Sequence, residues 1–400
     1  MNKMQKVLEN VLGDISLSKE QERGIQETTK KFLKLLGGGF RVGGSLAKGT
    51  LVKKKKQDVD LFFVFENEKD IGKLEGLLKK KKVNYRILHG SRDYFSISFE
   101  NVEFEIVPVK RFSKPEKAEN VTDFSLLHVD YIKKQIKKDK KIVNEIKLAK
   151  AFCHAQDYYG AESYIGGFSG YSLEVLVCYY KSFIKMLKGL QKDKIIDPAK
   201  YFKNRNLVMQ ELNASKLQSP IVVVDPTYQY RNVCAGLKQE TFDKFIKSAK
   251  KFLKKPTEKM FEKIKIDVEG LRRVGAKKEN LFLKIKLATN KQEGDIAGTK
   301  MKKFFDFLCS ELERKQQKVL AKEFVYSDGK TAEGFIVIKE NKIVDVRGPE
   351  KNMKNAIKSF KKVRKKTFTK GRHVWARERV SIDEILKRTK KVGAEMGVGF

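Results

Sequence analysis

The strongest constraint on the fold comes from a short apolar run, residues 58–65, that contains two aspartates near its start. β-branched and aromatic residues occupy both faces of this run, which is typical of a central strand buried in a sheet. Asp58 and Asp60 are two residues apart, so a strand places both carboxylates on one face, about 7 Å apart at Cα. Burying two carboxylates is costly unless a cation neutralises them. The run therefore predicts a buried strand whose aspartates bind hard divalent ions.

A glycine turn precedes this run. Gly43, Gly44 and Ser45 form it, and Ser45 lies thirteen residues before Asp58. The two glycines allow backbone N–H groups to approach a triphosphate, and the Ser45 hydroxyl adds a further donor. A pair of divalent ions about 3.5–4 Å apart would suit in-line attack of a hydroxyl group on phosphorus. The turn and the aspartates together indicate a site for chemistry on a nucleoside triphosphate.

A third carboxylate is expected from the strand predicted over residues 102–109. Glu103 and Glu105 are the candidates, and strand alternation places both on the same face. The periodicity alone does not choose between them.

The net charge indicates a polyanionic partner. The chain carries 87 Lys and Arg against 50 Asp and Glu, a formal net charge of +37. Nucleic acid is the leading candidate, and an anionic membrane surface is the main alternative. The charge is densest over residues 351–400, where 16 basic and 4 acidic residues give a net charge of +12.

The composition excludes several classes of protein. A hydrophobic content of 40% is too high for a disordered chain, and the absence of a run of about 18 apolar residues argues against a membrane span. The N-terminal residues lack the apolar segment of a signal peptide. The four cysteines are far apart in sequence, which indicates reduced thiols in the cytoplasm and excludes a disulfide framework or a zinc site. They are Cys153, Cys178, Cys234 and Cys309.

The order of the predicted elements indicates an α+β, multidomain fold. A small mixed-sheet domain over residues 1–122 precedes a helical domain over residues 123–255. Strands that alternate around one helix predict an antiparallel sheet of four or five strands over residues 256–350, and a basic tail follows over residues 351–400. The periodicity also predicts helices over residues 142–156, 169–187 and 198–212 and a strand over residues 263–268.

The motifs resemble those of a known superfamily. Gly44-Ser45, followed by Asp58 and Asp60 with apolar flanks, is similar to the signature of the DNA polymerase β-type nucleotidyltransferases. The central blocks resemble the archaeal CCA-adding enzymes over residues 152–171, 173–176 and 223–233. Those enzymes are tRNA nucleotidyltransferases that build the 3′-terminal CCA without a nucleic-acid template. The resemblance implies a catalytic head, a helical neck that completes the nucleotide pocket, and a body and tail that bind tRNA.

The same resemblance implies the substrates, cofactors and partners. CTP and ATP would be the nucleotides, two Mg²⁺ ions the cofactors, and the acceptor arm and TΨC region of tRNA the RNA partner. It further implies a cytoplasmic enzyme of archaeal type that has no contact with a membrane and is compatible with a homodimer.

Carried over residue by residue, the resemblance assigns roles to side chains. Asp58, Asp60 and Glu105 would be the catalytic, metal-binding carboxylates, and Glu105 is preferred because it stands three residues before Pro108. Glu105 replaces the usual aspartate of the family. Lys48 stands where many relatives have arginine. A compact ammonium group thus replaces a planar guanidinium that can donate two parallel hydrogen bonds. The nucleotide-binding residues would be Gly44, Ser45, Lys48, His128, Lys150, Tyr159, Arg231 and Asn232. The RNA-binding residues would be Arg372, Trp375 and Arg377.

Two other functions share parts of this pattern. A poly(A) polymerase or an oligoadenylate synthetase-like enzyme would carry the same Gly-Ser and Asp-x-Asp motifs, although residues 159–162 and the Arg231-Asn232 pair favour the CCA-adding family. A catalytically inactive tRNA-binding protein would keep the positive charge without needing the carboxylates. Trp375 also has two interpretations, as a core residue or as a platform that stacks on bases. Ser169 or Ser172 is expected to cap the helix that follows.

Overall fold

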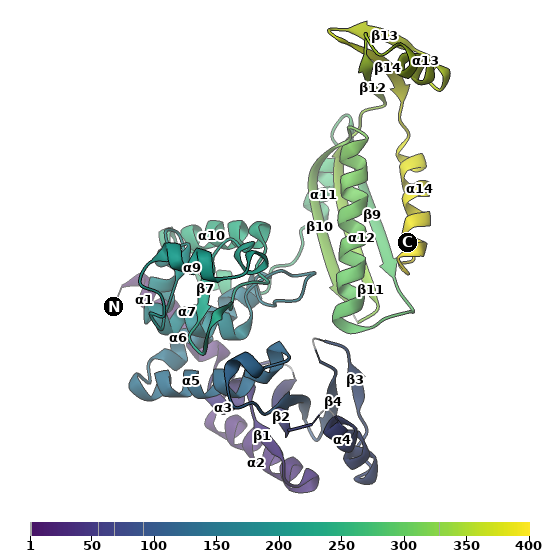
Figure 1. Ribbon diagram of the computed structural model, residues 1–400. Helices are drawn as coiled ribbons and strands as arrows, with labels where there is room; N and C mark the ends of the chain where they lie inside the picture. Colours follow the sequence, from purple (N-terminus) through teal and green to yellow (C-terminus); the bar gives the residue numbers. More distant parts are fainter. Residues whose placement is uncertain (1, 55, 68, 91, 328) are drawn as a thin grey trace. The chain divides into compact units, whose positions relative to one another are not determined.

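The computed structural model describes residues 2–54, 56–67, 69–90, 92–327 and 329–400. The chain divides into two compact units, Met1–Ile264 and Lys265–Phe400. The first unit combines a mixed sheet with helices, and the second contains antiparallel sheets and helices (Figure 1). The predicted α+β fold class is therefore confirmed. The finer division into four domains stays a prediction.

The sheet of the first unit has the strand order β1-β2-β5-β4-β3. β2 and β5 are parallel, and the other neighbours are antiparallel, so the sheet is mixed as predicted. β2, which carries both aspartates, lies inside the sheet rather than at its edge. The strands are β1 (Phe40–Val42), β2 (Gln57–Phe65), β3 (Arg86–Leu88), β4 (Tyr94–Phe99) and β5 (Val102–Lys110).

The two faces of this sheet have different partners. Helices α2 (Lys19–Leu36) and α4 (Lys69–Lys80) contribute to the apolar core on one face, where Phe32 of α2 stacks on Phe104 of β5 at 4.3 Å between ring centroids. Asp58 and Asp60 alternate with the residues of that core, so they lie on the opposite face. On that opposite face Phe62 packs in a cluster with Val129 of α5. The aspartates thus face the helical part of the unit.

The helical part has a core of its own, in which aromatic rings from different helices meet. The ring of Phe152 on α6 contacts Phe183 on α8 and Phe252 on α10, at centroid distances of 5.5 and 5.8 Å. Val7 and Val11 of α1, a helix that the sequence analysis did not predict, are also buried in this core. The helices are α1 (Lys3–Ile15), α5 (Ser125–Lys138), α6 (Ile142–Ala155), α7 (Gly170–Tyr180), α8 (Phe183–Gly189), α9 (Arg205–Glu211) and α10 (Gln239–Lys254). A small sheet with the order β6-β7-β8 lies beside them, from β6 (Ile195–Ile196), β7 (Val222–Asp225) and β8 (Tyr228–Asn232).

Two predicted helices are shorter than expected because local backbone and capping interrupt them. The helix expected over residues 169–187 is two helices, since Lys181 adopts a left-handed conformation (φ 66°) and the Ser182 side chain caps α8. The helix expected over residues 198–212 begins only at Arg205, where Asn204 caps α9. Ser169 caps α7 by accepting a hydrogen bond from the backbone of Ser172, which was one of the two expected caps.

The second unit differs from the predicted single sheet. Its described residues form two three-stranded sheets, with the orders β10-β11-β9 and β12-β14-β13. The strand predicted over residues 263–268 is wrong, because Asp267 there caps the helix α11 instead. The elements are α11 (Val268–Gly275), β9 (Asn280–Ala288), α12 (Gly294–Arg314), β10 (Lys318–Ser327), β11 (Thr331–Lys339), β12 (Ile343–Glu350), α13 (Lys354–Lys362), β13 (Thr367–Lys370), β14 (His373–Arg379) and α14 (Ile382–Glu395).

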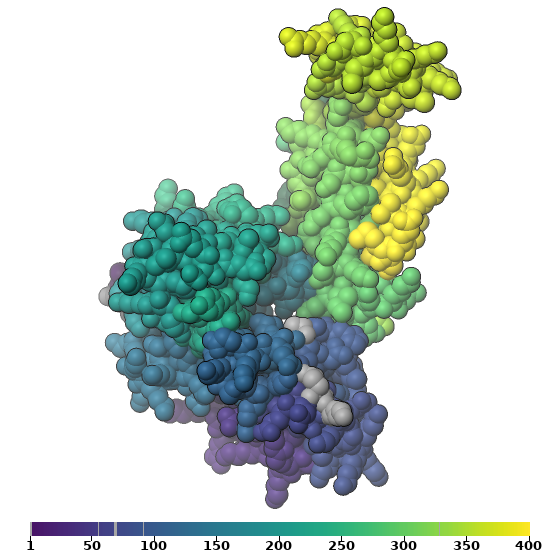
Figure 2. Space-filling model, viewed as in Figure 1, coloured from purple at the N-terminus to yellow at the C-terminus, as the bar shows by residue number. Residues whose placement is uncertain are grey.

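The basic C-terminal residues are folded together with the rest of the second unit. β12 pairs with β14 along its length, so strand pairing crosses the domain boundary that was predicted at residue 350. The yellow surface of α14 lies against the green surface of the preceding residues of the second unit (Figure 2), and Ile382 and Ile385 of α14 share a buried cluster with Phe304 of α12. Residues 351–400 are therefore a structured segment that completes a sheet and covers a helix.

Candidate active site

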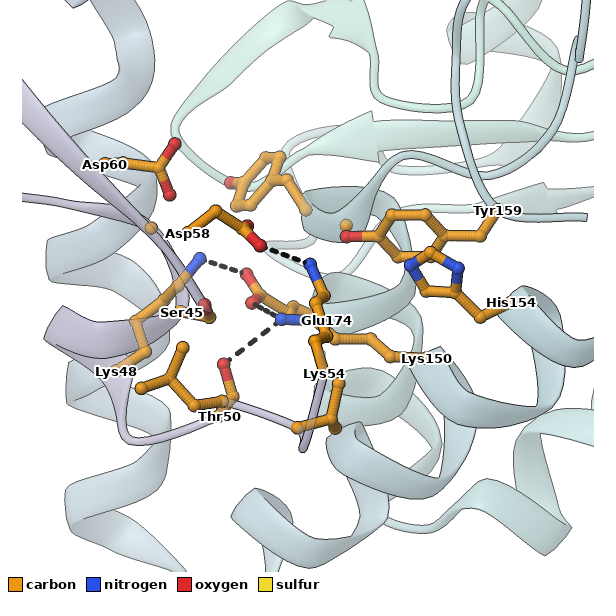
Figure 3. Close-up of a pocket in the computed structure, with 15 residues that line it drawn as sticks. Ser45, Lys48, Thr50, Lys54, Asp58, Asp60, Lys150, His154, Tyr159 and Glu174 are labelled. Carbon is orange, nitrogen blue, oxygen red and sulfur yellow. Dashed lines mark hydrogen bonds and ion pairs between the residues drawn. The ribbon is translucent and has the colours of Figure 1, made fainter. Parts of the chain in front are cut away.

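A cavity of about 240 Å³ in the first unit brings together most of the predicted catalytic and nucleotide-binding residues (Figure 3). Its walls come from α3 (Gly44–Lys48), β2, α6 and α7, so that Gly44 and Glu174, which are 130 residues apart in sequence, line the same cavity. The predicted residues that line it are Gly44, Ser45, Lys48, Asp58, Asp60, Lys150 and Tyr159. Residues that line it and were not predicted include Thr50, Lys54, His154, Tyr171 and Glu174.

The glycine turn is shaped by the strand behind it. The backbone N–H of Gly43 donates to the carbonyl of Asp60 at 2.8 Å, which fixes the turn against β2. A β-carbon at position 43 would lie 2.4 Å from the ring of Phe62, so a larger residue does not fit. Gly44 adopts a positive φ of 52°, a conformation that glycine adopts without strain. The two glycines therefore permit close approach of the backbone to an aspartate of the cavity.

The two aspartates form the acidic end of the cavity, and their carboxylates lie near each other in Figure 3. Burial raises the pKa of Asp60 above its ordinary value; the charge of Lys48 opposes this rise and that of Asp58 adds to it. Asp58 is paired with the Lys54 ammonium, at 2.7 Å from Nζ to Oδ1. Hard carboxylate oxygens of this kind fit a divalent cation such as Mg²⁺, which would relieve their repulsion. In the described part of the chain, however, no cluster of three His, Cys, Asp or Glu side chains is already assembled to hold a metal.

The two candidates for the third carboxylate have different surroundings. Glu103 accepts hydrogen bonds from the Lys56 ammonium and the Ser98 hydroxyl, and these bonds lower the pKa of Glu103. Glu105 is the register partner of Asp60 across the parallel β2–β5 pair, so both leave the same face of the sheet on neighbouring strands. Neither glutamate lines the cavity itself.

The basic end of the cavity is organised by a buried glutamate. Glu174 of α7 is fully buried, and its two carboxylate oxygens accept hydrogen bonds from Lys48 Nζ at 2.7 Å and from Lys150 Nζ at 2.8 Å. Lys150 also donates to Thr50 Oγ1 at 3.1 Å. Burial would raise the pKa of Glu174, but the charges of Lys150 and Lys48 outweigh it and the pKa lies below its ordinary value. Burial lowers the pKa of Lys150 despite this carboxylate.

One wall of the cavity is aromatic. The His154 and Tyr159 rings stack at 4.2 Å between centroids with an interplanar angle of 16°. Partial burial, to which the charges of Lys54 and Lys263 add, lowers the pKa of His154 to about 4. The imidazole is therefore neutral at physiological pH. Burial raises the pKa of Tyr159 above its ordinary value, so its hydroxyl stays protonated and can donate a hydrogen bond.

A second polar cluster lies next to the cavity, around Asp225 of β7. Arg231 Nη1 lies 2.6 Å from Asp225 Oδ2 and 2.8 Å from His128 Nε2. The Tyr171 hydroxyl donates to Asp225 Oδ1 at 3.0 Å, and the Tyr171 ring stacks on His128 at 3.7 Å between centroids. Because Tyr171 also lines the cavity, it links this cluster to the cavity wall that carries Lys150 and Glu174. Burial lowers the pKa of His128, although the hydrogen bond to Asp225 and its negative charge oppose this shift.

Asn232, which was predicted to bind the nucleotide, has its hydrogen bonds inside the protein. Its Oδ1 accepts from the backbone N–H groups of Val223 and Cys234, each at 2.9 Å. Its Nδ2 donates to the carbonyl of Lys216 and to the hydroxyl of Ser219, each at 2.8 Å. The side chain is buried and does not line the cavity. It ties β7 and β8 to the preceding turn.

The predicted RNA-binding residues lie on and next to β14 in the second unit. Arg377 makes a bidentate pair with Asp345, at 2.9 and 3.2 Å, and is largely exposed. Trp375 is partly buried, and its indole N–H donates to the carbonyl of Lys370 at 3.2 Å. Arg372 is exposed. An RNA phosphate would thus compete with Asp345 for Arg377.

Comparison with known families supports the interpretation of the first unit. Residues 144–262 match the family model described as tRNA nucleotidyltransferase, second domain. The cavity residues Lys150, Tyr159 and Glu174 fall inside that match. In addition, no helix in the described ranges has both the length and the apolar character that a membrane crossing requires.

Curated proteins named CCA-adding enzyme align with a large part of the chain. The protein from Nanoarchaeum equitans is 41% identical over 209 residues, which are 50% of this chain and 52% of the relative. The protein from Pyrobaculum aerophilum is 31% identical over 276 residues, with 66% and 63% covered. The protein from Saccharolobus shibatae is 31% identical over 280 residues, with 66% and 65% covered. The chain thus spans between half and two thirds of the length of these relatives.

Solved structures give the same fold at low sequence identity. A cytoplasmic RNA terminal U-transferase superposes with a TM-score of 0.51 at 13% identity, over 66% of this chain and all of the other. The Cid1 poly(U) polymerase, bound to Mg 3′-dATP, superposes with a TM-score of 0.52 at 11% identity, over 66% and 99%. Over the aligned part of its length this chain is similar to archaeal proteins named CCA-adding enzyme, as its motifs had indicated.

Proposed function

We propose that this chain is a template-independent tRNA nucleotidyltransferase that adds C, C and A to the 3′ end of tRNA from CTP and ATP. The observation that carries the proposal is a single cavity that joins Asp58 and Asp60 to Lys48 and Lys150, in a chain whose curated relatives are named CCA-adding enzyme. An acidic end suited to metal and a basic end suited to phosphate are what nucleotidyl transfer needs.

The cofactor is Mg²⁺, in the form of two ions held by Asp58 and Asp60 with Glu105 as the third carboxylate. Bound there, the metal would polarise the attacking hydroxyl group and neutralise charge on the triphosphate. The raised pKa of Asp60 and the alignment of Glu105 beside it support this assignment. A solved neighbour with the same fold, the Cid1 poly(U) polymerase, has been described with Mg and a nucleotide.

The reaction forms one bond and breaks another at the α-phosphorus of the nucleotide. The tRNA 3′-oxygen forms a bond to that phosphorus, the bond to the bridging oxygen breaks, and pyrophosphate leaves. Glu105 or Asp60 takes the hydroxyl proton. Lys48 and Lys150 balance the charge of the triphosphate, and the hydroxyl groups of Ser45 and Tyr159 donate hydrogen bonds to its oxygens.

Base selection is the role of the cluster beside the cavity. Asp225 and His128 both contact Nη1 of Arg231. The remaining N–H groups of the guanidinium can then donate hydrogen bonds to a base. Tyr171 joins this cluster to the cavity, so a nucleotide with its phosphates near Lys150 would have its base near Arg231. A fixed fork of donors can accept C and A and reject G and U.

The RNA partner is tRNA, bound through its acceptor arm and TΨC region. The net charge of +37 and its concentration in residues 351–400 support a contact with RNA phosphates. The four cysteines are free and buried, which suits the reducing cytoplasm.

The proposal is tested with three tRNA substrates that end at the discriminator base, at C and at CC. Each is incubated with labelled CTP, ATP or both, and the products are resolved at single-nucleotide length. We expect addition that stops at CCA. Unlimited addition of A would indicate a poly(A) polymerase, a short 2′-linked product an oligoadenylate synthetase, and tRNA binding without incorporation an inactive tRNA-binding protein. Each of those three results would overturn the proposal.

A further inference from the structure

The buried carboxylate of Glu174 lines the cavity, and the proposed reaction does not use it directly. We infer that Glu174 is a positioning residue that aims Lys48 and Lys150 at the triphosphate. This inference rests on the proposed nucleotidyl transfer, because it assigns a triphosphate to the basic end of the cavity.

Glu174 binds two lysines at once, and we call the three side chains of Glu174, Lys48 and Lys150 the clamp. Each of its two oxygens holds a different lysine, at 2.7 Å for Lys48 and 2.8 Å for Lys150. The exposed fractions of the three side chains are 0% for Glu174, 9% for Lys48 and 7% for Lys150. Figure 3 shows the carboxylate between the two ammonium groups, with Thr50 as the further partner of Lys150. Neither lysine can swing away without breaking a charge-assisted hydrogen bond.

The charge of this group favours a ligand-binding role over a purely structural one. Two ammonium groups share one carboxylate, so the trio keeps a net positive charge where it lines the cavity. A buried ion pair is weak evidence for stability, because desolvation offsets the attraction. Asp123, a fully buried carboxylate elsewhere in this unit, pairs with the single cation Arg92 and accepts bonds from backbone N–H groups, and it does not line the cavity. The net positive charge of Lys48, Lys150 and Glu174, fixed in position, is complementary to the negative charge of a polyphosphate.

The clamp also joins two distant parts of the cavity wall. Lys48 ends α3, directly after the glycine turn, whereas Lys150 and Glu174 belong to α6 and α7. One carboxylate therefore sets the separation of the two ammonium groups across the wall. The inference predicts that both the charge and the length of residue 174 matter.

The test measures binding of inorganic pyrophosphate, ATP, CTP and AMP to the full chain without tRNA, by calorimetry in the presence of Mg²⁺. Glu174→Gln removes the charge and keeps the shape, and Glu174→Asp keeps the charge and shortens the reach. We expect both variants to bind pyrophosphate, ATP and CTP roughly tenfold or more weakly. AMP binding should change little, because AMP lacks the β- and γ-phosphates.

Two further variants separate positioning from loss of folding. Thr50→Val removes only the contact with Lys150 and should weaken pyrophosphate and ATP binding in the same pattern, by a smaller factor. Glu145→Gln is the matched control, since Glu145 is a part-buried carboxylate of α6 that accepts from the backbone of Phe183 and does not line the cavity. It should leave pyrophosphate binding unchanged. If Glu174→Gln does not fold, pyrophosphate binding to Thr50→Val tests whether the position of Lys150 matters.

Wild-type pyrophosphate affinity in folded Glu174→Gln or in Thr50→Val would overturn the inference, as would an equal loss of AMP and ATP binding. Wild-type pyrophosphate affinity in Glu174→Asp would show that only the charge of residue 174 matters. That result would also overturn the inference that Glu174 positions the two lysines. Because no RNA is present, these results are independent of CCA addition. A failed addition assay with the expected binding pattern would remove the proposed function and leave a triphosphate site.

Discussion

Gly44 and Asp60 are in such close contact that a β-carbon at position 44 would lie 1.6 Å from Asp60 Oδ2. Gly44→Ala must therefore displace the carboxylate, and its positive φ adds backbone strain. A shift of about 1 Å in a catalytic group can cost a hundredfold in rate, and we expect a loss of about that size in CMP addition. Gly76→Ala, in α4 where a β-carbon meets nothing within 4 Å, is the control and should retain full activity. Equal activities for the two variants would contradict the close contact.

The two aspartates should be needed for chemistry and not for RNA binding. Asp58→Asn and Asp60→Asn keep the side-chain shape but remove the negative charge that a divalent ion requires. We expect nucleotide addition to fall by roughly 10²–10³-fold or more, with tRNA affinity unchanged in a filter-binding assay. Mn²⁺ binding, followed by electron paramagnetic resonance, should weaken in both variants. Asp243→Asn, at an exposed position of α10, serves as the control, and normal turnover in either cavity variant would refute the assignment.

The choice between the two glutamates of β5 can be tested directly. Because Glu105 lies in register with Asp60 while Glu103 is bound to Lys56 and Ser98, Glu105→Gln should reduce single-turnover CMP addition about a hundredfold. Glu103→Gln should stay near the wild-type rate. Glu105→Asp, which restores the usual residue of the family, should retain most of the activity. The opposite pattern would identify Glu103 as the third carboxylate.

The Asp225 cluster should govern which base is accepted. Asp225→Asn removes the charge that fixes Arg231, so its guanidinium loses its orientation. We expect the ratio of kcat/KM for CTP to that for UTP to fall by about tenfold or more, while pyrophosphate binding is unchanged. Asp193→Asn provides the same substitution at an aspartate that accepts from Tyr180 outside the cavity. A loss of pyrophosphate binding without a change in base preference would exclude this role.

Asn232 should be important for stability rather than for base contact. Asn232→Ala would leave the buried N–H groups of Val223 and Cys234 without acceptors. The expected loss in free energy of unfolding is about 2–4 kcal/mol, measured by urea denaturation. Asn213→Ala, at an exposed helix cap, should cost about 1 kcal/mol. A large rise in the KM for CTP with unchanged stability would instead support the predicted contact with the base.

The local sequence pattern was enough to predict a mixed sheet with strands over residues 58–65 and 102–109, because strand alternation and turn residues are local properties. β2 and its aspartates are the clearest case, since an apolar strand with two carboxylates on one face has few other interpretations. The break in the helix expected over residues 169–187 was missed. It depends on one left-handed residue, Lys181, in a segment whose apolar periodicity continues on both sides.

The partners of individual side chains could not be predicted in the same way. Glu174 was visible as one acidic residue in an apolar helical run, but its partner Lys48 is 126 residues away in sequence. Asn232 and Arg231 are adjacent in sequence. The Asn232 side chain makes hydrogen bonds within the protein interior, whereas Arg231 lies in the cluster beside the cavity. In the second unit, alternation predicted most strands but not their pairing, so two sheets were taken for one. Such contacts depend on tertiary packing, which a single sequence does not record.

The pairing of β12 with β14 has a consequence for how the basic C-terminal residues would bind the proposed RNA partner. A disordered basic segment would lose conformational entropy when it became ordered on RNA, and that loss would reduce its affinity. Here folding of the sheet has already restricted the backbone that carries Arg372 and Arg377. The separation of the two backbone positions is set before any ligand arrives, and a partner whose phosphates lie within reach of both side chains is favoured over one that merely carries the same charge.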